Sequence, residues 1–355
     1  DRFPGDIFLS ETRLEKFKKV LKNANAPIAV ILTHLDPDSI ACARIFIKIC
    51  EGYEVPARIF YCGILDDPQN KFIWNKFKLV DDFAPIEKLV AMKDIDKYRT
   101  VLLDSSAISD QRLGQFKINP MIIIDHHPSK TSQIEETADT WYYVHTCGAA
   151  VSLMVQLFLS LEMKFVQGDD LATLAVIGIK TDTKILDSTD LDIGVLAYLL
   201  IGKYADTKRA KETEDAMKDL EYLKLFHQAY ANMKQEGNVS VTCLGFMQRE
   251  KIGLIARLAD ELCGYKGIDT VIMWAIADDN CIYIKVRSVD NKLDLDEFIK
   301  KNFGATRGGA REGGKGAAMI PLDFFAPTTE TDSREELLGF LKKHITSKVL
   351  KISSK

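Results

Sequence analysis

Three short stretches of the chain each end an apolar run with side chains of the kind that bind metal ions. The runs are residues 28–32, 100–103 and 121–124. The side chains that follow them are His34, Asp36 and Asp38, then Asp104, then Asp125, His126 and His127. Carboxylates and imidazoles gathered in one cleft repel and desolvate one another unless cations lie between them. The set therefore predicts a two-metal enzyme.

The elements that must position these side chains are strands. Apolar β-branched runs of this length are typical of buried parallel strands, and ligands bind beyond the carboxyl ends of such strands. Because alternate residues of an extended segment share a side, His34, Asp36 and Asp38 can face one cavity. Two ions ~3.5–4 Å apart need a bridging carboxylate, for which Asp104 is the candidate. An Asp after a strand is also an ordinary turn residue, but three of the six histidines fall in these motifs.

The composition restricts the class of protein. A hydrophobic fraction of 46% and a charged fraction of 28% are normal for a globular protein, and no apolar run is long enough for a membrane span. No signal peptide is visible, and the seven cysteines fit reduced thiols. We therefore expect a cytoplasmic protein with no membrane partner. The net charge of −4 argues against a broad basic surface for long nucleic acid and favours a small anionic substrate.

The alternation of strand-like and helix-like segments predicts an α/β fold with two domains. We expect an N-terminal parallel-sheet domain over residues 1–195, a charged helical linker over 196–234, a smaller α/β domain over 235–345 and a tail over 346–355. Within the first domain, Ser39 is the expected N-cap of a helix that runs to about Cys50. A glycine-rich stretch from Gly304 to Gly316 is expected to be a loop.

The motifs carry a family resemblance. The chain resembles the DHH phosphoesterases, which include RecJ-like nucleases, bacterial nanoRNases, cyclic-dinucleotide phosphodiesterases and family II pyrophosphatases. The four matching motifs, in the family's order, are residues 34–43 (HLDPDSIACA), Asp104, Asp125-His126-His127, and residues 178–183 (GIKTDT) with Asp182 in the ligand position. Lys184 stands where a glycine is common in the fourth motif.

This resemblance implies a role for each motif residue. His34 and Asp36 would flank one metal ion, and the other would be held by Asp38, His126 and Asp182. Asp104 would bridge the two ions. Asp125 would orient a ligating imidazole, and His127 would face the substrate phosphate. Mixed imidazole and carboxylate ligands suit two Mn²⁺ ions, with Mg²⁺ or Co²⁺ as alternatives.

The C-terminal half resembles the DHH-associated substrate-binding domain. The matching parts are residues 284–288 (IKVRS), the segment from Leu293 to Phe303, and residues 308–318 with their paired glycines. The residues expected to bind substrate are Arg287, Ser288, Arg307, Arg311, Gly313, Gly314 and Lys315. Backbone amides beside glycines can form an anion nest; a flexible surface loop is the alternative. Lys315 stands where nanoRNase-like relatives usually have a histidine.

Together these features predict a metal-dependent phosphoesterase acting on a short nucleotide or oligonucleotide. The expected substrates are short oligonucleotides, linear dinucleotides or 3′-phosphoadenosine 5′-phosphate. Three alternatives stay open: a cyclic-dinucleotide phosphodiesterase, a RecJ-like single-strand exonuclease, and a non-hydrolytic nucleotide-binding protein. A homodimer is compatible with this interpretation. His145, His227 and His344 lie outside the motifs, and we expect each to be structural or solvated.

Overall fold

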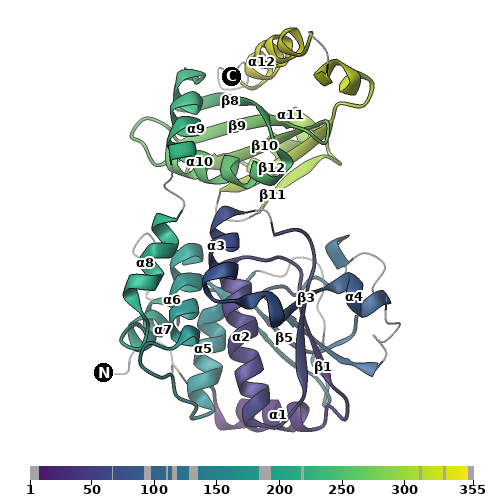
Figure 1. The fold of residues 1–355 in the computed structure, drawn as a ribbon, viewed down its shortest axis with the longest axis vertical. Helices are drawn as coiled ribbons and strands as arrows, with labels where there is room; N and C mark the ends of the chain where they lie inside the picture. The colour runs from purple at the N-terminus through teal and green to yellow at the C-terminus, as the bar shows by residue number, and fades with distance from the viewer. Residues whose placement is uncertain are drawn as a thin grey trace. The chain divides into compact units, whose positions relative to one another are not determined.

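The structure is a computed structural model that describes residues 8–65, 67–91, 97–108, 111–113, 118–127, 135–183, 193–216, 220–311, 314–330 and 333–350. The chain divides into two compact units (Figure 1). The first comprises Asp1–Leu65 and Gln69–Asp215, and the second comprises Asp66–Pro68 and Ala216–Lys355.

The first unit is built on a six-stranded parallel sheet, which confirms the predicted α/β class. Its strands are β1 (Ile28–Leu32), β2 (Ala57–Tyr61), β3 (Phe83–Pro85), β4 (Arg99–Leu103), β5 (Pro120–Asp125) and β6 (Trp141–Val144). They lie in the order β3-β2-β1-β4-β5-β6. The chain therefore runs from β1 through β2 to β3 at one edge of the sheet. It then crosses to the other side of β1, where it forms β4. Ligands bind at the crevice made by such a reversal of strand order.

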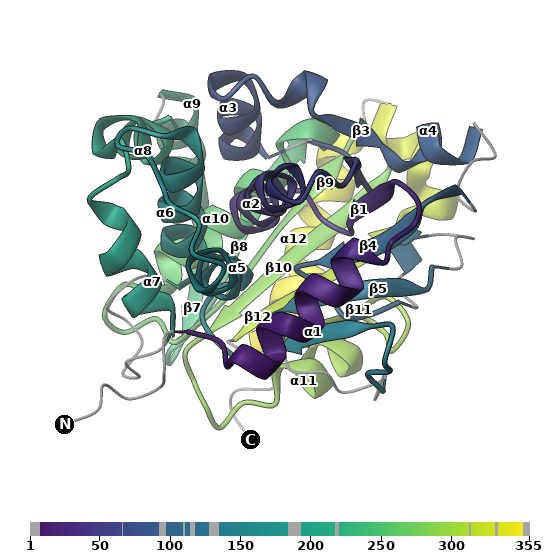
Figure 2. The ribbon, with the colours of Figure 1, turned by 90° about the horizontal axis from the view of Figure 1, so that it is seen from below.

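Helices cover both faces of this sheet. They are α1 (Glu11–Lys22), α2 (Pro37–Gly52), α3 (Pro68–Lys76), α4 (Ile86–Ala91), α5 (Ala150–Ser160), α6 (Asp170–Thr183), α7 (Ile193–Gly202) and α8 (Thr207–Asp215), with 3₁₀ turns at Leu79–Asp81 and Gln111–Leu113. Val30 packs into a core with α1, α2, α5 and α6, whereas its neighbour Ile31 packs on the opposite face with α4. Helices α2, α5 and α6 lie side by side (Figure 2). Burial on both faces explains why the strands are continuously apolar.

The second unit has a mixed six-stranded sheet in the order β11-β12-β10-β9-β8-β7. Its elements are α9 (Leu220–Ala231), β7 (Lys234–Glu236), β8 (Val239–Met247), a 3₁₀ turn (Arg249–Lys251), α10 (Gly253–Cys263), β9 (Thr270–Ala277), β10 (Cys281–Ser288), α11 (Leu295–Phe303), β11 (Gly308–Arg311), β12 (Lys315–Pro321), a 3₁₀ segment (Asp323–Glu330) and α12 (Arg334–Leu350). Only β8 and β9 pair in parallel. Helices α9 and α10 contribute to the core on one face, and α11 and α12 to the core on the other.

The structure differs from three of the expectations drawn from the sequence. The described part of the linker expected over 196–234 is mostly helical, in α7 and α8, which belong to the first unit, and in α9, which belongs to the second. Part of the glycine-rich stretch expected as a loop is instead strand, because Gly308–Arg311 forms β11 and pairs antiparallel with β12, which begins at Lys315. The N-cap of α2 is Asp36 rather than Ser39, because Pro37 begins the helix and the Asp36 carboxylate accepts from the Ser39 amide. Among the described residues, no helix is both long and apolar enough to cross a membrane.

Candidate metal centre

The strand register brings the three motifs to one edge of the sheet. Leu32 of β1 lies opposite Leu103 of β4, and Leu103 lies opposite Ile124 of β5. The residues that follow these strands therefore emerge side by side. The Asp104 amide continues the pairing by donating to the Ile124 carbonyl at 2.8 Å. Asp104 has a φ of +55°, a conformation that Asp tolerates better than most residues.

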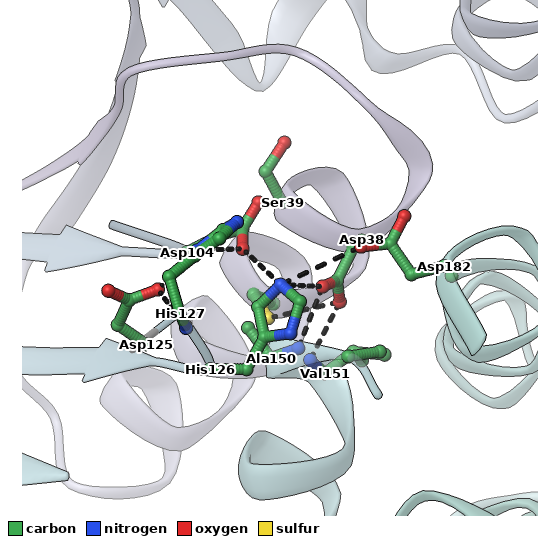
Figure 3. A network of polar contacts seen from close by, with 12 residues as sticks. Asp38, Ser39, Asp104, Asp125, His126, His127, Ala150, Val151 and Asp182 are labelled. Carbon is green, nitrogen blue, oxygen red and sulfur yellow. Dashed lines mark hydrogen bonds and ion pairs between the residues drawn. The ribbon is translucent and has the colours of Figure 1, made fainter. Parts of the chain in front are cut away.

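His126 is the centre of the cluster. Its Nε2 atom lies 3.4 Å from Asp104 Oδ1, 3.7 Å from Asp182 Oδ2 and 3.8 Å from Asp38 Oδ2 (Figure 3). These carboxylates come from the end of β4, the last turn of α6 and the first turn of α2. One imidazole nitrogen thus faces three carboxylates that are far apart in the sequence.

The tautomer of His126 follows from its other nitrogen. Nδ1 lies 3.0 Å from the carbonyl oxygen of Cys147. Because a carbonyl only accepts hydrogen bonds, Nδ1 must carry a proton. In the neutral ring Nε2 is then the lone-pair donor, which is the arrangement that a metal-binding histidine needs.

Two buried atoms in the cluster lack partners. Asp104 Oδ1 and His126 Nε2 have no hydrogen-bond partner among the described residues. Unpaired buried polar atoms are costly. A divalent cation between the carboxylates and Nε2 would satisfy both atoms, so the donor set fits a metal ion.

The electrostatics of the cluster favour a bound cation. Burial and the Asp38 carboxylate raise the pKa of Asp104 well above its ordinary value. Burial also raises the pKa of Asp38 to about 6, although the charge of His126 opposes it. For His126, burial lowers the pKa, but the Asp104 and Asp38 carboxylates outweigh it and raise the pKa to about 10. Without a metal, the cluster holds protons that a cation would displace.

Asp38 also accepts hydrogen bonds from backbone amides. Its Oδ2 and Oδ1 accept hydrogen bonds from the amides of Ala150 and Val151, each at 2.7 Å. Helix α5 has Ala149 at its N-cap and therefore no side-chain cap of its own, so Asp38 caps it from α2. Each carboxylate oxygen has two lone pairs, so these bonds leave capacity for a metal ion.

The loop that carries the first motif is held by groups on both sides. Ser39 Oγ donates to the His34 carbonyl at 2.8 Å, and Asn70 Nδ2 donates to the Leu35 carbonyl at 2.6 Å. His34 itself is exposed and Asp36 is half-buried. No sequence signal pointed to Asn70, because it lies on α3, outside every motif.

Asp125 contacts His127 rather than His126. Its Oδ1 lies 2.7 Å from His127 Nδ1 and also accepts from the His127 amide at 3.2 Å. Burial raises the pKa of Asp125, but the hydrogen bonds from His127 outweigh it and leave the pKa below its usual value. The ionised carboxylate only accepts, so it holds a proton on His127 Nδ1.

Asp182 reaches the cluster because α6 approaches α2 very closely. At Gly178, one turn before Asp182, a Cβ atom would lie 3.0 Å from the Pro37 carbonyl oxygen and 3.2 Å from Asp38 Cα. Only glycine permits this approach without a shift. Among the described residues, two groups have ligand atoms within 4.8 Å of one another, namely Asp38, His126 and Asp182, and Asp104, His126 and His127.

Several of the residues that were expected to bind substrate form hydrogen bonds within the second unit. Arg287 Nε donates to Asp260 Oδ1 at 2.7 Å, and Ser288 Oγ lies 2.8 Å from Thr270 Oγ1. Lys315 is exposed and lies opposite Arg287 in the sheet register. The Arg307 backbone pairs with Gly304 and Met319. Gly313, Lys184 and the side chain of Arg311 lie outside the described residues.

The glycines of this region have a packing role. A Cβ at Gly314, whose φ is +71°, would lie 1.8 Å from the Ser288 carbonyl oxygen. At Gly316 it would lie 2.2 Å from the Ile299 side chain. Close contact of β12 with β10 and α11 therefore requires both glycines, whatever the hairpin binds.

Comparison with known proteins shows what this chain is similar to. No family model matches it. It is 28% identical over 347 residues to an uncharacterised protein of Methanocaldococcus jannaschii, covering 96% of this chain and 67% of that protein. Among solved structures, an exopolyphosphatase-related protein from Bacteroides fragilis aligns with a TM-score of 0.66 and 14% identity, covering 95% of this chain and 98% of its own.

A second solved structure is also similar. The exonuclease RecJ bound to manganese aligns with a TM-score of 0.53 and 12% identity, covering 99% of this chain and 97% of its own. At such identities the likeness demonstrates a common fold. The chain therefore shares its fold with the RecJ exonuclease and with the exopolyphosphatase-related protein.

Proposed function

We propose that this chain is a DHH-type phosphoesterase that depends on two divalent metal ions and hydrolyses short nucleotide substrates. The observation that carries the proposal is His126, whose Nε2 faces Asp38, Asp104 and Asp182 at 3.4–3.8 Å while its Nδ1 is fixed by a backbone carbonyl. The donor chemistry and the fold shared with RecJ and the exopolyphosphatase-related protein both support it.

The residues divide into those that would hold metal and those that would act on the phosphate. Asp38, His126 and Asp182 would hold one ion, His34 and Asp36 would flank the other, and Asp104 would contact both. Such ions, with Mn²⁺ as the expected metal, would supply a nucleophile from water at neutral pH and polarise a phosphoryl oxygen.

His127 is the group best suited to bind the phosphate. Its ring is 40% exposed, whereas Asp125 behind it is buried. Asp125 accepts a hydrogen bond from His127 Nδ1 and so orients the ring. Nε2 is then the ring nitrogen that would face a phosphate oxygen. The Asp125–His127 pair thus has the form of a carboxylate-oriented imidazole.

The substrate class is the finer part of the proposal. The acidic overall charge favours short oligonucleotides, linear dinucleotides or 3′-phosphoadenosine 5′-phosphate. The fold shared with the RecJ exonuclease favours one alternative, a single-strand exonuclease acting on longer chains.

A substrate panel tests the proposal. The wild-type protein with Mn²⁺ should release 5′-mononucleotides or phosphate from substrates of two to five nucleotides. A long-strand nuclease would instead become more active with length and lose activity steeply with salt, because it contacts many phosphates. Saturable binding of every substrate without any product would contradict enzymatic function and identify a nucleotide-binding protein.

A further inference from the structure

One row of aromatic side chains leads along β6 to the candidate metal centre. Trp141, Tyr143 and His145 alternate along the strand and its extension, so they share a face. The centroids of Trp141 and Tyr143 are 5.8 Å apart, and the rings of Tyr143 and His145 stack at 6.4 Å with an interplanar angle of 23°. Phe17 of α1 continues the row behind Trp141 at 5.0 Å.

Burial decreases along this row toward the metal centre. Trp141 is fully buried, Tyr143 is half-buried and donates its hydroxyl hydrogen bond to Gln156, and His145 is exposed. Among the described residues, the His145 ring contacts no aromatic ring except Tyr143 and forms no hydrogen bond or ion pair. The last ring of the row is therefore open to solvent while the ring behind it is held in place.

His145 is tied directly to the metal-centre motif. Its amide donates to the Asp125 carbonyl at 3.1 Å. Two residues later, the Cys147 carbonyl meets His126 Nδ1 at 3.0 Å. The backbone of residues 145–147 thus lies beside Asp125 and His126, which places His145 at the sheet edge that carries the candidate metal centre.

We propose that His145, backed by Tyr143, stacks on a nucleobase of the substrate. This inference rests on the proposed function and deepens it, because it names the side chain that would hold the base of the nucleotide substrate. A π-face rather than a set of hydrogen-bond donors would recognise the base, so the site would accept different bases. The sequence-based view of His145 as a structural or solvated histidine is the alternative.

Paired substrates isolate the contribution of the base. The first is a 5′-phosphorylated diadenylate, and the second is the same dinucleotide with both bases replaced by hydrogen. His145→Ala should lower kcat/KM for the diadenylate about tenfold or more, as expected for the loss of a base-stacking ring. It should leave kcat/KM for the abasic analogue unchanged. His145→Phe should restore the diadenylate value, and His227→Ala, which removes an exposed histidine of α9, should change neither.

Equilibrium binding separates this inference from the proposed reaction. Calorimetry with Mn²⁺ should show that adenosine 5′-monophosphate binds more tightly than ribose 5-phosphate, and that His145→Ala removes most of the difference. If wild-type protein cleaves neither dinucleotide, the proposed reaction fails, and the binding difference still decides the role of His145. If His145→Ala affects the paired ligands equally, or affects neither, the stacking role is refuted.

Discussion

The imidazole Nε2 of His126 lies 3.4 Å from Oδ1 of Asp104, and neither atom has a hydrogen-bond partner among the described residues. Two complementary groups brought this close without a hydrogen bond leave room for an ion that contacts both. The strand register produces this relationship, because Asp104 directly follows β4, His126 directly follows β5, and these two strands pair in parallel.

Replacing Asp104 tests the bridging carboxylate. Asp104→Asn keeps the side-chain shape and tolerates the positive φ, so it removes mainly the charge. We expect turnover in Mn²⁺ to fall at least about 100-fold, since even supporting residues of metal sites cost 10–100-fold. The metal-free variant should be as stable as wild type or more so, because a buried carboxylate among like charges is lost. Steady-state kinetics measure the turnover, and thermal melting measures the stability. Asp81→Asn, at an exposed position, is the control. Normal turnover by Asp104→Asn would exclude Asp104 as the bridging ligand.

A glycine pair tests the close approach of α6 to α2. Gly178→Ala should destabilise the protein by about 1–3 kcal/mol through overpacking, since the new Cβ would lie 3.0 Å from the Pro37 carbonyl oxygen. It should also weaken Mn²⁺ binding, because Asp182 follows on the same helix. Gly202→Ala is the matched control, because no atom lies within 4 Å of its Cβ position. Denaturant unfolding and metal titration measure the effects; equal behaviour of the two variants would refute the packing argument.

Metal affinity should depend on pH with a defined sign. The pKa of His126 is raised to about 10 and that of Asp104 well above its ordinary value, which favours protons on the metal-free cluster at neutral pH. Metal binding requires deprotonated ligands and must release these protons. The apparent Kd for Mn²⁺ should therefore decrease as pH rises from 6 to 9, by about tenfold per pH unit for each proton released. Calorimetry in buffers of different ionisation enthalpy measures the release, and a pH-independent Kd would contradict the expected protonation.

Arg287 and Asp260 form an ion pair, and replacing each residue separately tests what the pair does. If Arg287 binds a substrate phosphate, Arg287→Ala should lower kcat/KM about tenfold or more by loss of positioning, with metal binding unchanged. Asp260→Ala keeps the cation and should retain most of the activity. A purely structural pair would instead give the two variants the same losses in stability and activity. Kinetics on a dinucleotide together with melting curves distinguishes these outcomes.

The sequence indicates which residues gather at this edge of the sheet, but it does not indicate the contacts that support them. The runs before Asp104 and Asp125 carry strong local signals, because strands buried on both faces are continuously apolar. The contacts that orient the site carry no such signal. Asp38 caps α5 across more than a hundred residues, and a backbone carbonyl, which any residue at position 147 would supply, orients His126. Asn70 likewise acts through the Leu35 carbonyl.

In the glycine-rich stretch, the composition of the sequence suggests the wrong structure. Its composition is typical of a loop, yet Gly314 and Gly316 are needed because β12 packs tightly on its neighbours. Residues 63–98 carry no element in the sequence-based prediction, although α3, β3 and α4 form there. These short elements give too few turns or alternations for a periodic signal.

The most direct test of the metal centre is an anomalous difference map at the manganese absorption edge, from crystals grown with Mn²⁺. The account predicts a peak in contact with Asp38, Asp104, His126 and Asp182, and a second peak on the other side of Asp104 beside His34 and Asp36. The absence of any peak among Asp104, His126 and Asp182 at saturating Mn²⁺ would contradict it.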